Sequence, residues 1–294
     1  MNVQAAINAG LFVQFVYNNW NGPSQSTSLD GRAVVNPAGQ PVIPGKNYVV
    51  LKTIYSNDLA TDINPQKPLT EGYKTIGVVA QNGADATDVF IAVRGTEGIW
   101  EWLQDFKFLP RPFPNVAGSG VTEDGFTDMY LSFSFTPAPS GTFMKDLAAL
   151  LPSNAVVTIA GHSLGSALAT LLALDLAANT KLSTSLYTLA SPRVGDLIFH
   201  NLFNHVVPNA YRIANRLDVV PQTPAPPLYF HVGDDTELIP PGTLKHDLGC
   251  EHSIDSYFNM LSTLMGQPSA YPIDSNCLMQ APAAAATTAQ PGAK

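Results

Sequence analysis

The chain of 294 residues carries 15 Lys and Arg against 23 Asp and Glu, a formal net charge of −8, and only 13% of its residues are charged. Apolar residues make up 45%, enough for a sizeable core, so the composition excludes global disorder. An acidic chain without a basic cluster is a poor binder of nucleic acid or of anionic membranes. We therefore expect a neutral substrate and no nucleic-acid partner.

The chain has no stretch of about 18 uncharged, mostly apolar residues, so we expect no transmembrane anchor. Its apolar start, residues 5–17, lacks the basic region of a signal peptide, because the first cationic side chain is Arg32. We expect the mature chain of a secreted protein, with a cytoplasmic protein as the alternative. The two cysteines, Cys250 and Cys277, are too few for a disulfide scaffold or a Cys-rich zinc site, but they can form one bridge; two buried free thiols are the alternative.

In chain order, residues 3–20 predict a helix and residues 21–46, rich in Gly, Pro, Ser and Asn, predict a loop. Further along, strands are predicted at 48–55, 75–80, 88–93, 155–160, 185–190 and 210–214, with helices at 164–180 and 195–206. This alternation predicts an α/β fold with a mostly parallel central sheet flanked by helices. Residues 281–294 are of low complexity and predict a disordered tail, which leaves residues 1–280 as a single domain.

The candidate nucleophile is Ser163, in the segment Gly161-His162-Ser163-Leu164-Gly165, which matches the pattern G-x-S-x-G. The match lies between a predicted strand and a predicted helix, where this pattern forms a strained turn that exposes the serine. A serine at a helix N-terminus also directs the N–H of Leu164 at a developing oxyanion. An ordinary glycine-bounded turn with an incidental serine is the alternative, and the flanking strand and helix argue against it.

A nucleophilic serine needs a histidine base and an acid that orients this base, and in α/β-hydrolases both follow the serine in the chain. Asp218 follows a predicted strand, at the end of the sheet where such folds place their sites, whereas Asp234, Asp235, Asp247 and Asp255 remain competitors. Three downstream histidines lie in regular apolar runs and look structural: His200, His205 and His231. The residues alone therefore leave two candidates for the base, His246 and His252.

Six segments, in order, resemble the class 3 lipases, which include the fungal triacylglycerol lipases and their bacterial relatives, on an α/β-hydrolase fold. They are residues 91–106, 123–130, 157–177, 187–196, 211–224 and 250–257, whereas the first ninety residues match in general character only. The resemblance implies a triad of Ser163, Asp218 and His252, and thereby selects His252 over His246. It implies an oxyanion hole formed by Thr96 and by the N–H of Leu164.

Two residues depart from the family pattern. Ser166 stands where the family usually has glycine, and we expect close helix packing to tolerate its small side chain. Asp124 stands where fungal enzymes often carry a basic residue, outside the triad.

The segment 97–106 matches the lid of the family. On a helical wheel, one face carries four apolar side chains, those of Ile99, Trp102, Leu103 and Phe106. Trp100 lies off this face. An ordinary amphipathic helix packed on the core is the alternative. Its position directly after the oxyanion strand favours a lid that contacts substrate.

The resemblance implies a serine carboxylic ester hydrolase, first of all a lipase that cleaves acylglycerols through an acyl-enzyme. A phospholipase or an aryl-ester (feruloyl-type) esterase would use the same triad. The alternative outside the enzymes is a non-catalytic lipid-binding protein, and the intact triad and oxyanion hole argue against it. No metal or organic cofactor is implied, and the expected partners are a neutral ester lipid and, transiently, a lipid–water interface.

Overall fold

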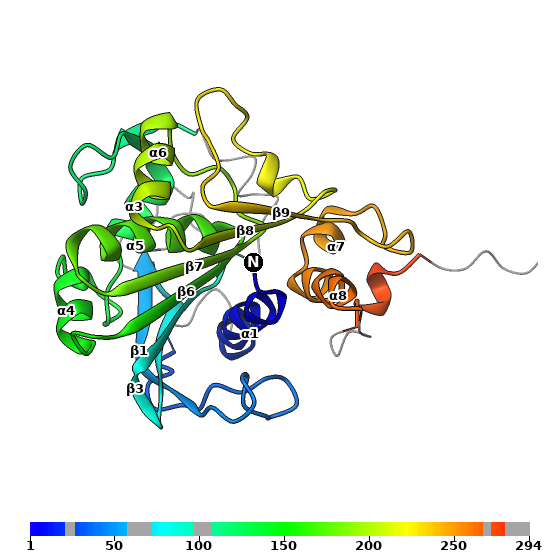
Figure 1. Ribbon diagram of the computed structural model, residues 1–294, viewed down its shortest axis with the longest axis horizontal. Helices are drawn as coiled ribbons and strands as arrows, with labels where there is room; N and C mark the ends of the chain where they lie inside the picture. The colour runs from blue at the N-terminus through cyan, green and yellow to red at the C-terminus, as the bar shows by residue number, and fades with distance from the viewer. Residues whose placement is uncertain (21–26, 58–71, 97–107, 267–271, 280–294) are drawn as a thin grey trace, which may run out of the picture.

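The central element of the fold is a mixed β-sheet. The computed structural model describes residues 1–20, 27–57, 72–96, 108–266 and 272–279 (Figure 1). Within them, seven strands pair in the order β1-β2-β3-β6-β7-β8-β9. These strands are β1 (Tyr48–Asn57), β2 (Tyr73–Asn82), β3 (Asp85–Val93), β6 (Val156–His162), β7 (Ser183–Leu189), β8 (Ala210–Asn215) and β9 (Asp234–Leu238). The first three pair antiparallel, and all pairs from β3 to β9 are parallel.

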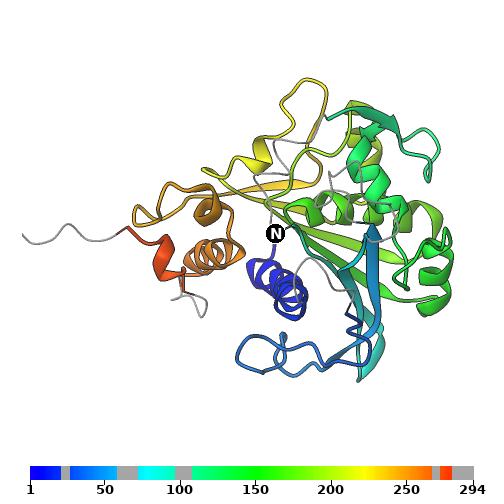
Figure 2. The ribbon, with the colours of Figure 1, turned by 180° about the vertical axis from the view of Figure 1, so that it is seen from behind.

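Helices cover both faces of this sheet (Figures 1 and 2). One face carries α1 (Val3–Asn19) and α8 (Ile254–Leu264), with the short α7 (Leu248–His252) beside α8. The other face carries α3 (Asp124–Leu131), α4 (Phe143–Leu150), α5 (Leu164–Asn179) and α6 (Leu197–Val206). The smaller elements are β4 (Pro110–Pro112), β5 (Val121–Glu123), η3 (Val220–Gln222) and η4 (Ser275–Cys277). The predicted α/β architecture, a mostly parallel sheet flanked by helices, is confirmed.

Strand β3 shows how the sequence builds two cores. Val89, Ile91 and Val93 join the core beneath α5, whereas Phe90 and Ala92 join the core beneath α1. Successive side chains of a strand point to opposite faces, so a strand covered on both sides is apolar throughout. The buried helix predicted after Ser163 is α5, whose residues from Leu164 to Leu176 are all buried.

Strand β9 is not predicted from the sequence because it lacks an apolar pattern. Its sequence, DDTEL, contains three acidic residues, and only Leu238 of the five is buried. It lies at the edge of the sheet and pairs with β8 through its backbone. Such pairing does not require apolar side chains.

The C-terminal part of the described chain is fastened by a disulfide between Cys250 and Cys277. The bond joins α7 to η4, and Leu244 and Ile273 pack with Cys250 in a small separate core. Of the two expected states of the cysteines, the structure therefore has the bridge. No helix within the described ranges has the length and apolar character needed to cross a bilayer. The predicted tail, residues 281–294, lies outside the described residues.

Candidate active site

Ser163 occupies the sharp turn between β6 and α5. Its backbone has φ of 59° and ψ of −133°, a conformation that a residue with a side chain adopts only under strain. The turn is held by two backbone hydrogen bonds, from Ser163 N–H to the carbonyl of Leu189 (3.0 Å) and from Ser166 N–H to the carbonyl of Ser163 (2.8 Å). Strained, over-determined turns of this kind are typical of functional residues.

The two glycines of the motif allow this turn to form. A Cβ on Gly161 would lie 2.3 Å from the carbonyl oxygen of Gly165, which is far inside van der Waals contact. A Cβ on Gly165 would lie 2.4 Å from the carbonyl oxygen of Val93 in β3. The start of α5 therefore packs directly against the backbone of both β6 and β3. Ser166, the departure from the family pattern, is fully buried and donates its hydroxyl hydrogen bond to the carbonyl of Leu189 (2.8 Å).

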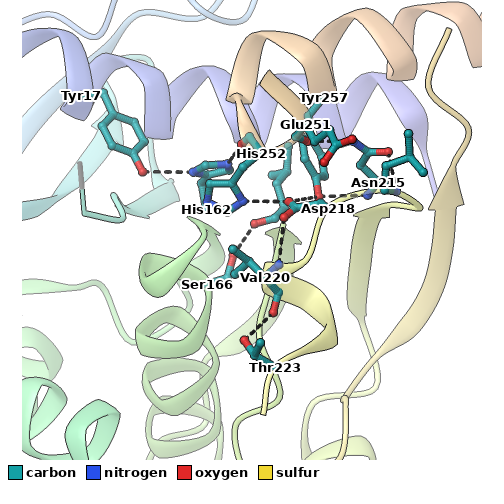
Figure 3. A network of polar contacts seen from close by, with 12 residues as sticks. Tyr17, His162, Ser166, Asn215, Asp218, Val220, Thr223, Glu251, His252 and Tyr257 are labelled. Carbon is teal, nitrogen blue, oxygen red and sulfur yellow. Dashed lines mark hydrogen bonds and ion pairs between the residues drawn. The ribbon is translucent and has the colours of Figure 1, made fainter. Parts of the chain in front are cut away.

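The structure brings Asp218 and His252 together (Figure 3). His252 Nδ1–H donates a 2.8 Å hydrogen bond to Asp218 Oδ2. The same carboxylate accepts from the hydroxyl of Tyr257 (2.9 Å) and from the N–H of Val220 (2.9 Å), and it is wholly buried. Three donors fix both carboxylate oxygens, so Asp218 can orient the imidazole and stabilise its charged form.

Two groups of this site have no hydrogen-bond partner among the described residues. They are the hydroxyl of Ser163 and Nε2 of His252, and both are buried. His252 and Thr96 line one mostly apolar cavity of about 240 Å³ together with Tyr17, His162, Gly249, Ser253 and Ile254. The turn that precedes Thr96 also reaches the serine, because a Cβ on Gly95 would lie 2.8 Å from Ser163 Cβ. An unpaired polar atom on a residue that lines a cavity, as His252 does, is available to a substrate.

Among the described residues, the four other histidines that follow Ser163 in the chain do not contact Asp218. The side chain of His246 is 70% exposed, and its Nδ1 pairs with Glu251 rather than with Asp218. His231 Nε2–H donates to the carbonyl of Pro221 (2.9 Å), and burial lowers the pKa of His231 to about 3. Nδ1 of His200 contacts the carbonyl of His231. His205 lies in the last turn of α6.

The competing aspartates also have other roles. Asp234 and Asp235 are exposed on β9, and Asp247 caps α7 through the N–H of Cys250. Asp255 accepts a 2.7 Å hydrogen bond from Gln14.

A buried arginine that carries no signal in the sequence holds the end of the strand before Thr96. Arg94 donates from Nε to the carbonyl of Thr75 (2.8 Å) and from Nη1 to the carbonyl of Gly95 (2.6 Å). Its guanidinium lies 3.6 Å from the centre of the Trp20 ring. The carbonyl of Gly95 belongs to the same peptide as the N–H of Thr96, so Arg94 fixes the orientation of that N–H.

Of the remaining predicted site residues, the structure describes Leu164 but not the lid. Leu164 is the first residue of α5, so its N–H lies among the unpaired donors of the helix N-terminus. The predicted lid, residues 97–106 with Ile99, Trp100, Trp102, Leu103 and Phe106, lies outside the described residues. Within the described ranges, no three His, Cys, Asp or Glu side chains are grouped as metal ligands would be.

A strand–serine–helix turn, with an Asp–His pair supplied after later parallel strands, defines an α/β-hydrolase. The profile of the family described as "Lipase (class 3)" matches residues 90–227. The chain is 35% identical over 206 residues to a lipase of Rhizomucor miehei, covering 66% of this chain and 52% of that protein. It is 31% identical over 222 residues to a phospholipase A1-II 3 of Oryza sativa subsp. indica, covering 65% and 52%.

The crystal structure of a lipase from Rhizopus microsporus var. chinensis superposes with a TM-score of 0.53 at 20% identity, over 80% of this chain and 78% of that one, which supports the fold. Over residues 90–227 the chain is similar to the class 3 lipase family. It spans about half the length of the curated relatives that it matches.

Proposed function

We propose that this protein is a serine carboxylic ester hydrolase that cleaves acylglycerols. The observation that carries the proposal is the buried pair of Asp218 and His252, which leaves Nε2 of the imidazole without a partner among the described residues. The ring centre of His252 lies 4.7 Å from that of His162, the residue before Ser163. The match of residues 90–227 to the class 3 lipase family and the resemblance of the motifs support the assignment of Ser163, Asp218 and His252 as the triad.

In the proposed reaction, His252 Nε2 takes the proton of the Ser163 hydroxyl while the oxygen attacks the ester carbonyl carbon. The N–H groups of Thr96 and Leu164 stabilise the resulting oxyanion. Collapse of the intermediate breaks the bond to the alcohol, which leaves with the proton from His252, and the acyl group stays on Ser163. Water then repeats the cycle on the acyl-enzyme and releases the carboxylic acid.

The substrate class that we propose is a neutral acylglycerol, met at a lipid–water interface. The mostly apolar cavity beside His252 and the similarity to a Rhizomucor miehei lipase support it. A phospholipase is the second candidate, because several relatives at 29–31% identity are plant phospholipases A1. We further propose that the protein works in an oxidising compartment, as a secreted enzyme does, because disulfides persist there.

The test of the mechanism is active-site labelling with a fluorophosphonate, followed by peptide mass spectrometry. We expect a single adduct on Ser163, and no adduct and no ester hydrolysis in the folded variant Ser163→Ala. A Ser163→Ala protein that turns over a short p-nitrophenyl ester at a near-normal rate would refute the proposal.

The two substrate classes are separated by parallel assays on emulsified triolein and on phosphatidylcholine vesicles. A rate on triolein at least tenfold above the rate on phosphatidylcholine supports the lipase. The reverse ratio, with release of the sn-1 acyl chain, identifies a phospholipase A1 instead.

A further inference from the structure

The structure contains a continuous series of hydrogen bonds from the turn before Thr96 to the main chain of His252. Figure 3 shows the part from Tyr17 to His252. The hydroxyl of Tyr17, on α1, accepts from the N–H of Gly95 (2.7 Å) and lies 3.0 Å from Nδ1 of His162. On the other side of its ring, Nε2 of His162 lies 2.9 Å from the carbonyl oxygen of His252. Tyr17 and His162 thus connect the two sides of the candidate active site.

The chemistry of the groups fixes the direction of each hydrogen bond. A carbonyl oxygen only accepts, so Nε2 of His162 must carry a hydrogen. Burial, together with the nearby His252, holds the pKa of His162 well below its ordinary value, so this imidazole is neutral and its Nδ1 carries none. Nδ1 therefore accepts from the hydroxyl of Tyr17, whose oxygen in turn accepts from Gly95. In each of these three hydrogen bonds, a donor therefore faces an acceptor.

We propose that Tyr17 and His162 are positioning residues that fix the turn of Gly95 and Thr96 relative to the candidate base, His252. This inference rests on the proposed function, because it takes Thr96 as an oxyanion donor and His252 as the base. Gly95 immediately precedes Thr96, so a fixed Gly95 N–H helps to fix the donor. At the other end, the chain fixes the backbone of His252, while Asp218 fixes its ring at Nδ1.

The placement of the two side chains favours this role over simple core filling. His162 is 4% exposed and directly precedes Ser163, and its ring centre lies 4.7 Å from that of His252. Tyr17 and His162 also line the cavity shared by Thr96 and His252. A buried imidazole whose two nitrogens are both engaged has one permitted tautomer and one orientation, so it transmits position.

The kinetic test uses Tyr17→Phe, which removes only the hydroxyl, and His162→Leu, which removes both ring contacts. We expect each to lower kcat on a soluble ester about tenfold with KM within about twofold, as for the loss of a well-placed hydrogen bond. The double variant should be no worse than the more damaging single variant, because both break one chain. His162→Gln should recover part of the rate, since its amide can both accept and donate.

The matched control is Tyr130→Phe. Tyr130 donates a 2.6 Å hydrogen bond to the buried Asp175, away from the candidate site, so its loss should reduce stability and leave kcat unchanged. An unchanged kcat in Tyr17→Phe, or losses that multiply in the double variant, would overturn the proposal.

A second measurement does not depend on activity. In ¹⁵N-histidine NMR spectra at neutral pH, His162, assigned by loss of its signals in His162→Gln, should show a protonated Nε2 and an unprotonated, hydrogen-bonded Nδ1. Tyr17→Phe should shift Nδ1 alone. A cationic His162, or a hydrogen on Nδ1, would refute the proposed hydrogen bonds through Tyr17 and His162, whichever ester the enzyme hydrolyses. If wild type and Ser163→Ala are equally inactive on every ester, the proposed function fails instead, and the kinetic arm identifies that outcome.

Discussion

Gly165, in the first turn of α5, lies so close to Val93 at the end of β3 that a Cβ on the glycine would stand 2.4 Å from the valine carbonyl oxygen. The atom that it would meet is backbone in the middle of the sheet, which cannot move aside cheaply. The same Cβ would meet the carbonyl of Arg94 at 2.5 Å, one residue before Gly95. The helix that follows the candidate nucleophile and the turn that carries the candidate oxyanion donor are therefore in direct contact.

The first prediction is that Gly165→Ala pushes these two elements apart. We expect a loss of about 1–3 kcal/mol in the free energy of unfolding, as for overpacked cores, together with a marked fall in kcat. Urea denaturation and hydrolysis of p-nitrophenyl butyrate measure the two effects. Gly242→Ala is the control, because nothing lies within 4 Å of a Cβ at that glycine. Equal behaviour of the two variants would contradict the packing argument.

The second prediction concerns the choice of base. His252→Ala should abolish ester hydrolysis, because it removes the imidazole that Asp218 orients. His246→Ala should leave the rate within about twofold, because this side chain is exposed and pairs only with Glu251 among the described residues. Steady-state rates on a soluble ester decide between them. A lethal His246→Ala with an active His252→Ala would reverse the assignment.

The third prediction is a pH dependence of stability that arises at Glu123. Burial, together with the charges of Asp124 and Asp128, raises the pKa of this carboxyl to about 7, although it caps α3 by accepting from the N–H of Phe126. The folded state therefore binds a proton more tightly than the unfolded state does. The stabilisation is complete below the unfolded pKa of about 4.5 and is lost as the pH rises through about 7.

Glu123→Gln should remove this dependence, because the amide oxygen can still cap the helix without a charge. At pH 8 the variant should be more stable than wild type by up to roughly 3 kcal/mol, and at pH 4 the two should be similar. Urea midpoints at both pH values provide the measurement, with the exposed Glu237→Gln as the control. A variant that is less stable than wild type at pH 8 would show that the charged carboxylate is needed as the cap.

The fourth prediction is that the disulfide stabilises the segment that carries His252. Cys250 precedes His252 by two residues, and its partner Cys277 lies 27 residues further along the chain. In the chain-entropy model, a closed loop of this size contributes about 3–4 kcal/mol. The variant Cys250→Ser with Cys277→Ser should unfold at correspondingly lower urea concentration and should no longer respond to dithiothreitol. Equal midpoints for wild type and the double variant would refute the prediction.

The sequence by itself determined the features that depend on local pattern. The apolar strand, the glycine-bounded turn and the buried helix around Ser163 follow from period and turn chemistry, and so does the α/β class. The sequence also indicated Asp218 as a candidate acid, because this residue follows a predicted strand at the end of the sheet where such folds place their sites. The lid at residues 97–106 and the disordered tail at residues 281–294 remain predictions from the sequence.

Only the tertiary structure decided which side chains meet across the sheet. Asp218 and His252 are 34 residues apart, Tyr17 and His162 are 145 apart, and neither distance carries a local signal. Tyr257 and Arg94 look like ordinary helix and strand residues until the fold places one against the Asp218 carboxylate and the other against the Gly95 carbonyl. The physical reason is that a hydrogen bond is set by positions in space, and these positions are fixed by how α1, α7 and α8 pack against the ends of β3, β6 and β8.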